Sequence, residues 1–125
     1  MDKKLSFTRE EHLKSKKSID LLFAKGKAIS SNPIRLIYYF EENEAVLPQV
    51  LFSVSKRNFK RAVDRNRIKR QMREIYRLNR ERYFLPEGRN SYYLAFIYTV
   101  KEKIPYNSIE KKLNLALERL KTVSK

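Results

Sequence analysis

Residues 64–83 (DRNRIKRQMREIYRLNRERY) carry apolar side chains at helical spacing through a strongly basic sequence. At about 100° per residue, one arc of a helix would contain Ile68, Met72, Ile75, Tyr76, Asn79 and Tyr83. The adjoining arc would contain Asn66, Lys69, Arg70, Arg73, Arg77 and Arg80. The pattern therefore predicts a helix with Asp64 as its N-cap, which packs one face on a core and presents guanidinium groups beside it.

Positive charge is concentrated in the same region. The chain of 125 residues has a formal net charge of +15, and residues 56–82 contain twelve basic and three acidic side chains, a net +9. Arginine predominates on the predicted basic face, and arginine suits bidentate contacts with phosphate. We expect a nucleic acid backbone as the partner, with a merely solvated charged face as the alternative.

Residue counts argue against several other functions. The chain has no cysteine, and His12 is its only histidine, so thiol catalysis and a transition-metal centre are disfavoured. The acidic group Glu41, Glu42 and Glu44 is more typical of a solvated loop than of a Mg²⁺ site. We therefore predict no catalytic residue and no metal site in the protein.

No segment has the composition of a membrane anchor. No apolar run approaches the roughly 20 residues that cross a bilayer, and residues 1–11 lack the apolar core of a signal peptide. A membrane-surface role is disfavoured because the apolar arc of the basic helix contains Asn79 instead of a bulky inserting face. These features predict a cytoplasmic protein without a membrane partner.

The rest of the chain predicts a mixture of helices and strands. Ser15 or Ser18 is expected to cap a short helix that ends at Gly26 in a left-handed conformation. Strands are expected over 34–40 and 49–55, paired as a hairpin through the acidic turn. The most apolar run, 92–100, predicts a buried strand. A final helix after Pro105 would bury Ile109, Leu113, Ala116, Leu117 and Leu120, and the whole chain, 1–125, would form a single domain.

Residues 62–70 (AVDRNRIKR), continuing to Arg73 and Glu74, closely resemble the RNR signature of the bacterial ribonuclease P protein subunit. Residues 52–57 (FSVSKR) resemble the strand that precedes this motif in the family, and residues 21–26 (LLFAKG) resemble its first helix. Length, charge and order of elements agree over nearly the whole chain. Residues 57–61 (RNFKR) depart from the family pattern, because this loop is slightly longer and more basic.

The resemblance implies an α+β sandwich of order αβββαβα, with a four-stranded mixed sheet packed with helices as in the second domain of a small-subunit ribosomal protein. It also implies a function as the non-catalytic protein subunit of ribonuclease P. That ribozyme is an endonuclease that removes the 5′ leader from precursor tRNA. Its RNA subunit performs the hydrolysis with Mg²⁺, which it mainly binds itself. The partners would be ribonuclease P RNA, in a one-to-one complex, and precursor tRNA, in the bacterial cytoplasm.

By the same resemblance, the catalytic RNA would contact Arg65, Asn66, Arg67, Lys69, Arg70 and Arg73. A cleft between the first helix and the sheet would hold the 5′ leader against Ile19, Phe23, Tyr38, Ser53, Ser55 and Lys56. Family members often carry an aromatic residue where Ile19 stands, so only an apolar contact is expected there. Aromatic platforms beside a basic track suit a single strand, because stacking contributes about 1–3 kcal/mol per base. The alternative for Phe23 and Tyr38 is a place in the core.

Two other functions stay open at this point. An RNA-binding protein of ribosomal type, with no role in cleavage, would show the same charge pattern. A protein nuclease is disfavoured, because the sequence offers neither a histidine pair nor clustered carboxylates for two metal ions.

Overall fold

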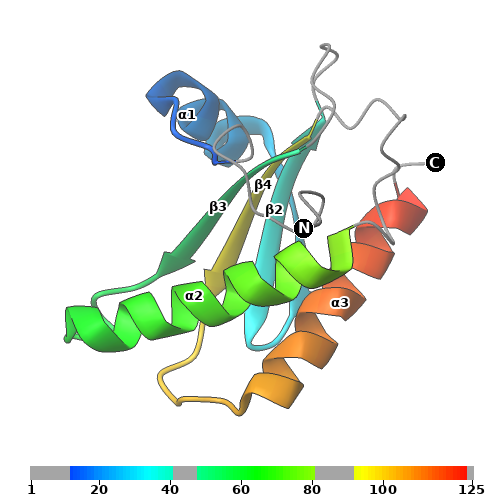
Figure 1. Ribbon diagram of the computed structural model, residues 1–125. Helices are drawn as coiled ribbons and strands as arrows, with labels where there is room; N and C mark the ends of the chain where they lie inside the picture. Colours follow the sequence, from blue (N-terminus) through cyan, green and yellow to red (C-terminus); the bar gives the residue numbers. More distant parts are fainter. Residues whose placement is uncertain (1–11, 41–47, 81–91, 124–125) are drawn as a thin grey trace, which may run out of the picture.

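The computed structural model describes residues 12–40, 48–80 and 92–123. Its elements are α1 (Lys16–Lys25), β1 (Lys27–Ser31), β2 (Ile34–Phe40), β3 (Gln49–Val54), α2 (Ala62–Asn79), β4 (Tyr92–Tyr98) and α3 (Tyr106–Val123) (Figure 1). This order is αβββαβα, and the four strands form one mixed sheet. The α+β class and the order of elements are therefore confirmed.

The strand order in the sheet is β1-β2-β4-β3. Strand β2 is antiparallel to both of its neighbours, whereas β3 runs parallel to β4. The predicted hairpin between the second and third strands is wrong, because β4 lies between them and the hairpin partner of β2 is β1. A strand as apolar as β4 is stabilised in the centre of a sheet, where helices cover both of its faces.

The main core lies between the sheet and the pair α2 and α3. Successive side chains of a strand point to opposite faces, and the buried residues that β2, β3 and β4 contribute to this core all have even numbers. The sheet contributes Ile34, Leu36, Val50, Val54, Leu94, Phe96 and Tyr98 to this core. The helices contribute Ile68, Met72, Ile75, Tyr76, Ile109, Leu113, Ala116, Leu117 and Leu120. The buried stripe of α3 is as predicted, and so is that of α2 up to Tyr76.

A smaller core lies on the other face of the sheet, beneath α1 (Figure 1). Its buried members are Leu13, Leu22 and Ala95, and Ile19, Ile37, Tyr39, Leu51 and Tyr93 pack against them. A helix of ten residues is only about 15 Å long, and α1 contacts β2 and β4. This face of the sheet is therefore less completely covered than the face beneath α2 and α3.

The ends of α1 are set by a cap and by close packing. The Ser15 hydroxyl accepts a hydrogen bond from the backbone N–H of Ser18 at 3.3 Å, so Ser15 is the N-cap. Gly26 has a φ of −71°, so the predicted left-handed conformation is wrong. Glycine is required for a different reason: a Cβ atom at this position would lie 2.3 Å from the Leu22 carbonyl oxygen and 2.9 Å from Cγ2 of Ile37.

Helix α2 begins earlier than predicted. Its N-cap is Arg61, with no capping hydrogen bond from the side chain, so the prediction of Asp64 as N-cap is wrong. Asp64 lies in the first turn, where its carboxylate accepts from the Lys103 ammonium at 3.0 Å. This contact lowers the pKa of Asp64 and ties α2 to the segment before α3. The predicted continuation of the helix to Tyr83 and the acidic turn at 41–44 lie outside the described residues.

Candidate nucleic-acid interface

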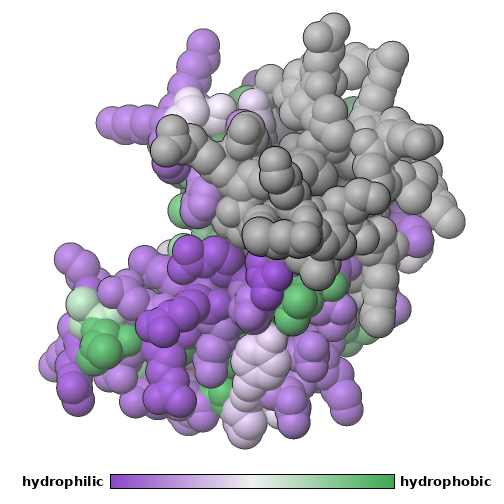
Figure 2. Space-filling model, viewed as in Figure 1, coloured by the Kyte–Doolittle hydropathy of each residue, from purple (hydrophilic) through white to green (hydrophobic). Residues whose placement is uncertain are grey.

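The basic side chains of α2 are distributed around three sides of the helix, because the buried stripe occupies the fourth. Asn66, Arg67 and Arg70 are exposed, whereas Lys69 and Arg73 are partly buried beside β3. Arg67 lies on the opposite flank, near Asp64, and its charge contributes to the lowered pKa of that carboxyl group. Figure 2 shows that hydrophilic side chains dominate the molecular surface over α2. Five of the six residues predicted to bind catalytic RNA thus lie on the outside or the β3 side of this helix.

Arg65, the sixth, makes contacts within the protein. Its Nη1 donates hydrogen bonds to the carbonyl oxygens of Phe59 and Lys60, each at 2.8 Å. The first arginine of the RNR sequence therefore holds the loop that precedes α2. Sequence alone could not separate this arginine from Arg67, which is two residues away and exposed.

Two further arginines depart from the predicted basic arc. The Arg77 guanidinium donates from Nε and Nη2 to the Glu74 carboxylate, at 2.8 and 2.6 Å. Glu74 lies three residues before Arg77, a spacing that brings two side chains together on one side of a helix. Arg80 is only 3% exposed, so it does not belong to the outer surface.

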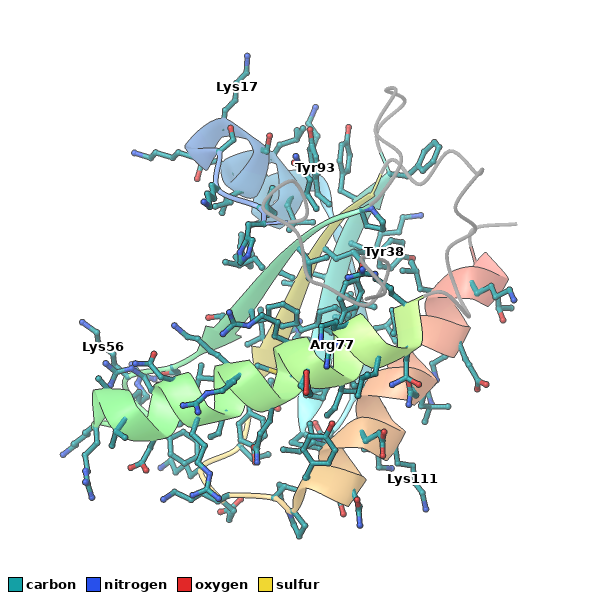
Figure 3. All side chains as sticks on the ribbon, viewed as in Figure 1. Lys17, Tyr38, Lys56, Arg77, Tyr93 and Lys111 are labelled. Atoms are coloured by element: carbon teal, nitrogen blue, oxygen red, sulfur yellow. The ribbon has the colours of Figure 1, made fainter. Side chains whose placement is uncertain are left out.

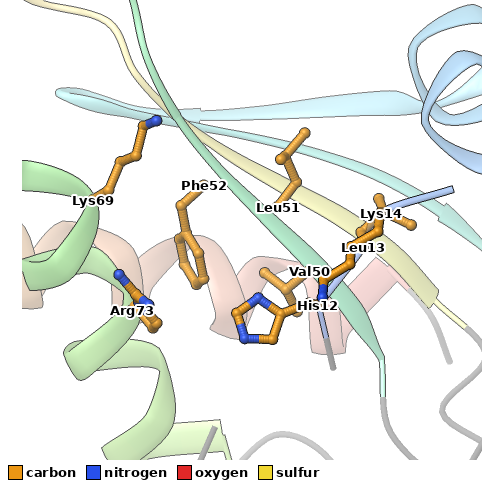
Figure 4. A pocket seen from close by; sticks show the side chains of 8 residues that line it. All are labelled: His12, Leu13, Lys14, Val50, Leu51, Phe52, Lys69 and Arg73. Carbon is orange, nitrogen blue, oxygen red and sulfur yellow. The ribbon is translucent and has the colours of Figure 1, made fainter. Parts of the chain in front are cut away.

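A groove follows the outer edge of β3, which is an edge strand of the sheet (Figure 4). The segment before α1 forms one wall, since His12 bridges to Val50 and the Leu13 N–H donates to the Val50 carbonyl at 3.0 Å. The other wall is α2. The groove has a volume of about 190 Å³ and is lined by His12, Leu13, Lys14, Val50, Leu51, Phe52, Lys69 and Arg73.

The groove combines an aromatic ring with cations. Figure 4 shows Phe52 between Lys69 and Arg73 on one side and His12 on the other. The Phe52 ring is held by packing against Phe96, at 5.6 Å between ring centroids, and against Tyr76, at 6.1 Å. A fixed aromatic surface beside basic side chains has the chemistry that binds single-stranded nucleic acid.

The six residues predicted to bind the 5′ leader do not form one cleft. Ile19 packs beneath α1, and Phe23 is 47% exposed on the same helix, so the core alternative for Phe23 is wrong. Ser53 is on the strand face that carries Leu51, while Ser55 and Lys56 are exposed beyond the end of β3. None of these residues lines the groove at β3.

The placement predicted for Tyr38 is wrong, because this side chain lies on the other face of the sheet. Tyr38 pairs with Leu94 in the register of β2 and β4, and it packs against the main core beneath α2 and α3. The aromatic residues on the α1 face are Tyr39 and Tyr93, whose rings stack with centroids 6.4 Å apart. Figure 3 shows Tyr93 close to α1 and Tyr38 farther from it.

The sequence contained a signal for the correct face. Arg35 is the one charged residue within β2. Because side chains alternate along a strand, Arg35, Ile37 and Tyr39 point to the same face. A charged residue marks the less covered face of a strand, so the aromatic residue on that face had to be Tyr39. The groove residues Lys14 and Phe52 were missed because the groove depends on how the segment before α1 pairs with β3.

Two other kinds of feature, a metal site and a membrane-spanning helix, are absent from the described residues. Within residues 12–40, 48–80 and 92–123, no group of three or more His, Cys, Asp or Glu side chains is placed to hold a metal ion. In the same part of the chain, no helix has the length and apolar character needed to cross a membrane.

Comparison with known proteins identifies relatives over most of the chain. The sequence model of the family described as Ribonuclease P matches residues 7–121. A ribonuclease P protein component of Porphyromonas gingivalis is 34% identical over 116 residues, which cover 90% of this chain and 85% of that protein. One from Chlorobium phaeobacteroides is 38% identical over 90 residues, covering 67% and 62% of the two chains.

Solved structures share the fold. The RNase P protein of Staphylococcus aureus superposes with a TM-score of 0.73 at 20% identity, over 88% of this chain and 94% of that one. The RNase P protein of Thermotoga maritima gives a TM-score of 0.71 at 22% identity, over 87% and 96%. From the family match over residues 7–121 and the identity to curated relatives, the chain belongs to the ribonuclease P protein family.

Proposed function

We propose that this chain is the protein subunit of ribonuclease P in the bacterial cytoplasm. It binds one ribonuclease P RNA and the 5′ leader of precursor tRNA, and it assists endonucleolytic removal of the leader. The observation that carries this proposal is the position of the groove at β3, whose wall is the helix that bears the RNR sequence. One surface can thus contact the catalytic RNA while the adjoining groove holds substrate.

The groove has the chemistry to hold a single-stranded leader. Lys69 and Arg73 supply two cations within reach of Phe52, and Lys14 adds a third from the opposite wall. Single strands bind to such sites with little dependence on sequence, because every base offers a face for stacking. A double-stranded tRNA stem offers only its phosphates and groove edges, so the groove distinguishes leader from stem.

The chemistry of hydrolysis is assigned to the RNA subunit with Mg²⁺. The charged side chains that line the groove are Lys14, Lys69 and Arg73, together with the imidazole of His12. Mg²⁺ prefers carboxylate and other oxygen ligands, so this set does not fit a Mg²⁺ site. The proposal therefore gives the protein the tasks of binding and orientation only.

Reconstitution tests the proposal. Purified protein, a bacterial ribonuclease P RNA and precursor tRNA are combined at low Mg²⁺, where the phosphates of the two RNAs are poorly neutralised. We expect faster cleavage at the mature 5′ end than with the RNA alone. No acceleration, despite binding to the RNA, would refute the proposal in favour of an RNA-binding protein without a role in cleavage. Cleavage by the protein without RNA would instead indicate a protein nuclease.

Leader binding is tested separately with Lys69→Gln/Arg73→Gln. The affinity of the assembled complex for precursor tRNA with a long leader is compared with its affinity for mature tRNA. We expect the ratio of these affinities to fall in the groove variant. The matched control is Lys111→Gln/Lys121→Gln, which removes the same charge from exposed positions of α3. Equal ratios in the two variants would show that the groove does not bind the leader.

A further inference from the structure

The loop between β3 and α2, residues 55–61 (SKRNFKR), forms a separate cationic surface. We name it the basic loop. Its exposed residues include four cations, Lys56, Arg57, Lys60 and Arg61, and it contains no carboxylate. The acidic residue that follows it most closely, Asp64, is paired with Lys103, which lowers its pKa, and the charge of Arg61 lowers that pKa further. The cations of the basic loop therefore form a positive surface without a neutralising partner inside the loop.

Contacts with the rest of the fold hold the basic loop in one conformation. Phe59 is only 7% exposed, and its ring packs against Tyr98 with centroids 5.9 Å apart. Its backbone N–H donates to the Ser55 carbonyl at 3.1 Å. Arg65 holds the next part of the loop through its two hydrogen bonds to the Phe59 and Lys60 carbonyls. A surface that is already ordered loses less conformational entropy when it binds a ligand.

The basic loop and the groove lie at different places along α2. Arg61 is the N-cap, and the two groove residues of α2, Lys69 and Arg73, follow it by eight and twelve positions. At about 1.5 Å per residue, these positions lie about 12 and 18 Å along the helix axis from Arg61. Figure 3 shows Lys56 at the end of the molecule where α2 begins. The basic loop therefore lies beyond the groove, toward the N-terminus of α2, and is a separate position for a contact with RNA.

The side chains of the basic loop fit phosphates and not bases. The aromatic residue of the loop, Phe59, is buried, so the loop offers no aromatic stacking platform of its own. Single strands need such platforms, whereas a folded RNA is held through its backbone. We propose that the basic loop is a second RNA-binding surface, which contacts the phosphates of a folded segment of the ribonuclease P RNA. This inference rests on the proposed function, and it assigns roles to Lys60 and Arg61.

The test uses full-length protein with Lys60→Gln/Arg61→Gln, and Lys111→Gln/Lys121→Gln as the control with the same change of charge. Binding to a fluorescently labelled bacterial ribonuclease P RNA is measured at a series of KCl concentrations. Each phosphate contact contributes about one unit to the slope of log affinity against log salt. We expect the slope of the loop variant to fall in magnitude by about two units, while the control keeps the wild-type slope.

Two results would overturn the inference. A wild-type slope in the loop variant would show that these side chains do not contact phosphate. A lower affinity for precursor tRNA relative to mature tRNA, as expected of the groove variant, would show that the loop binds leader instead of the RNA subunit. Both substituted side chains are exposed, and an unchanged urea unfolding midpoint checks that the fold is retained. If the proposed function itself is wrong, the wild-type protein will not accelerate cleavage in the reconstitution assay. That result distinguishes failure of the proposed function from failure of the inference about the basic loop.

Discussion

Arg65 is expected to stabilise the fold, although it belongs to the RNR sequence. Replacing it by methionine keeps much of the aliphatic volume but removes both hydrogen bonds to the Phe59 and Lys60 carbonyls. A hydrogen bond that involves a charged group contributes about 1.5–3 kcal/mol. Both bonds come from one nitrogen atom, and one of them is exposed to solvent. We therefore expect Arg65→Met to lower the free energy of unfolding by about 2–3 kcal/mol.

The control is Arg67→Met, at an exposed position two residues away. Each substitution removes one positive charge from a chain with a net charge of +15, so any relief of repulsion is similar in the two variants. Exposed substitutions usually change stability by less than about 0.5 kcal/mol. The difference in the free energy of unfolding between Arg65→Met and Arg67→Met therefore measures the contribution of the hydrogen bonds from Arg65 to the loop.

Urea unfolding, followed by circular dichroism, measures this difference. For a urea m value near 2 kcal/mol/M, a loss of about 2 kcal/mol moves the midpoint by about 1 M. The Arg65→Met midpoint should lie that far below the Arg67→Met midpoint. Midpoints within error of each other would refute the reasoning, because the loop would then hold its conformation without Arg65.

Two further substitutions test the packing of α1 and the ion pair on α2. Gly26→Ala should lower the free energy of unfolding by more than about 1 kcal/mol, because the new methyl group would overlap the Leu22 carbonyl oxygen. An unchanged thermal midpoint would contradict this. Asp64→Asn removes the pair with Lys103, which lowers the pKa of Asp64 in the folded protein. The pair's contribution is complete above pH of about 4 and is lost as pH falls through the lowered pKa. The difference in urea midpoint between wild type and Asp64→Asn should therefore be larger at neutral pH than at pH of about 3, and equal differences would argue against the pair.

The sequence predicted the helices well because their buried residues recur at an unmistakable spacing. Ile68 and Met72 on α2 are buried as the periodicity requires, and so are Ile109 and Leu113 on α3. Strand pairing was harder. The first strand, β1, is short and has only Ile29 as a β-branched residue, so nothing in its composition marks it as the partner of β2. Pairing is decided by burial of β4 in the centre of the sheet, which is a property of the whole fold.

The sequence predicted the kinds of side chain at the candidate site, which are basic and aromatic, better than it predicted where those side chains lie. The apolar and aromatic run of β2 leaves few polar residues to show which side chains share a face, so Tyr38 was assigned to the wrong side of the sheet. A shift of one residue along a strand reverses every side chain. The role of Arg65 depends on backbone carbonyls of a loop, which have no signature in the sequence. Lys69 and Arg73 were placed on one predicted arc of α2 with four other residues, but the sequence did not show that these two form a wall of a groove.

The edge of β3 also bears on whether two copies of this protein could pair along this strand. Edge strands present backbone groups that can pair with a second chain. Here His12 and Leu13 occupy part of that edge, and Lys69 and Arg73 stand beside the groove that follows it. Two copies that approach edge to edge would bring these cations together, whereas a polyanion would be attracted. The same side chains that form the groove thus favour a nucleic acid over another copy of the protein along this strand.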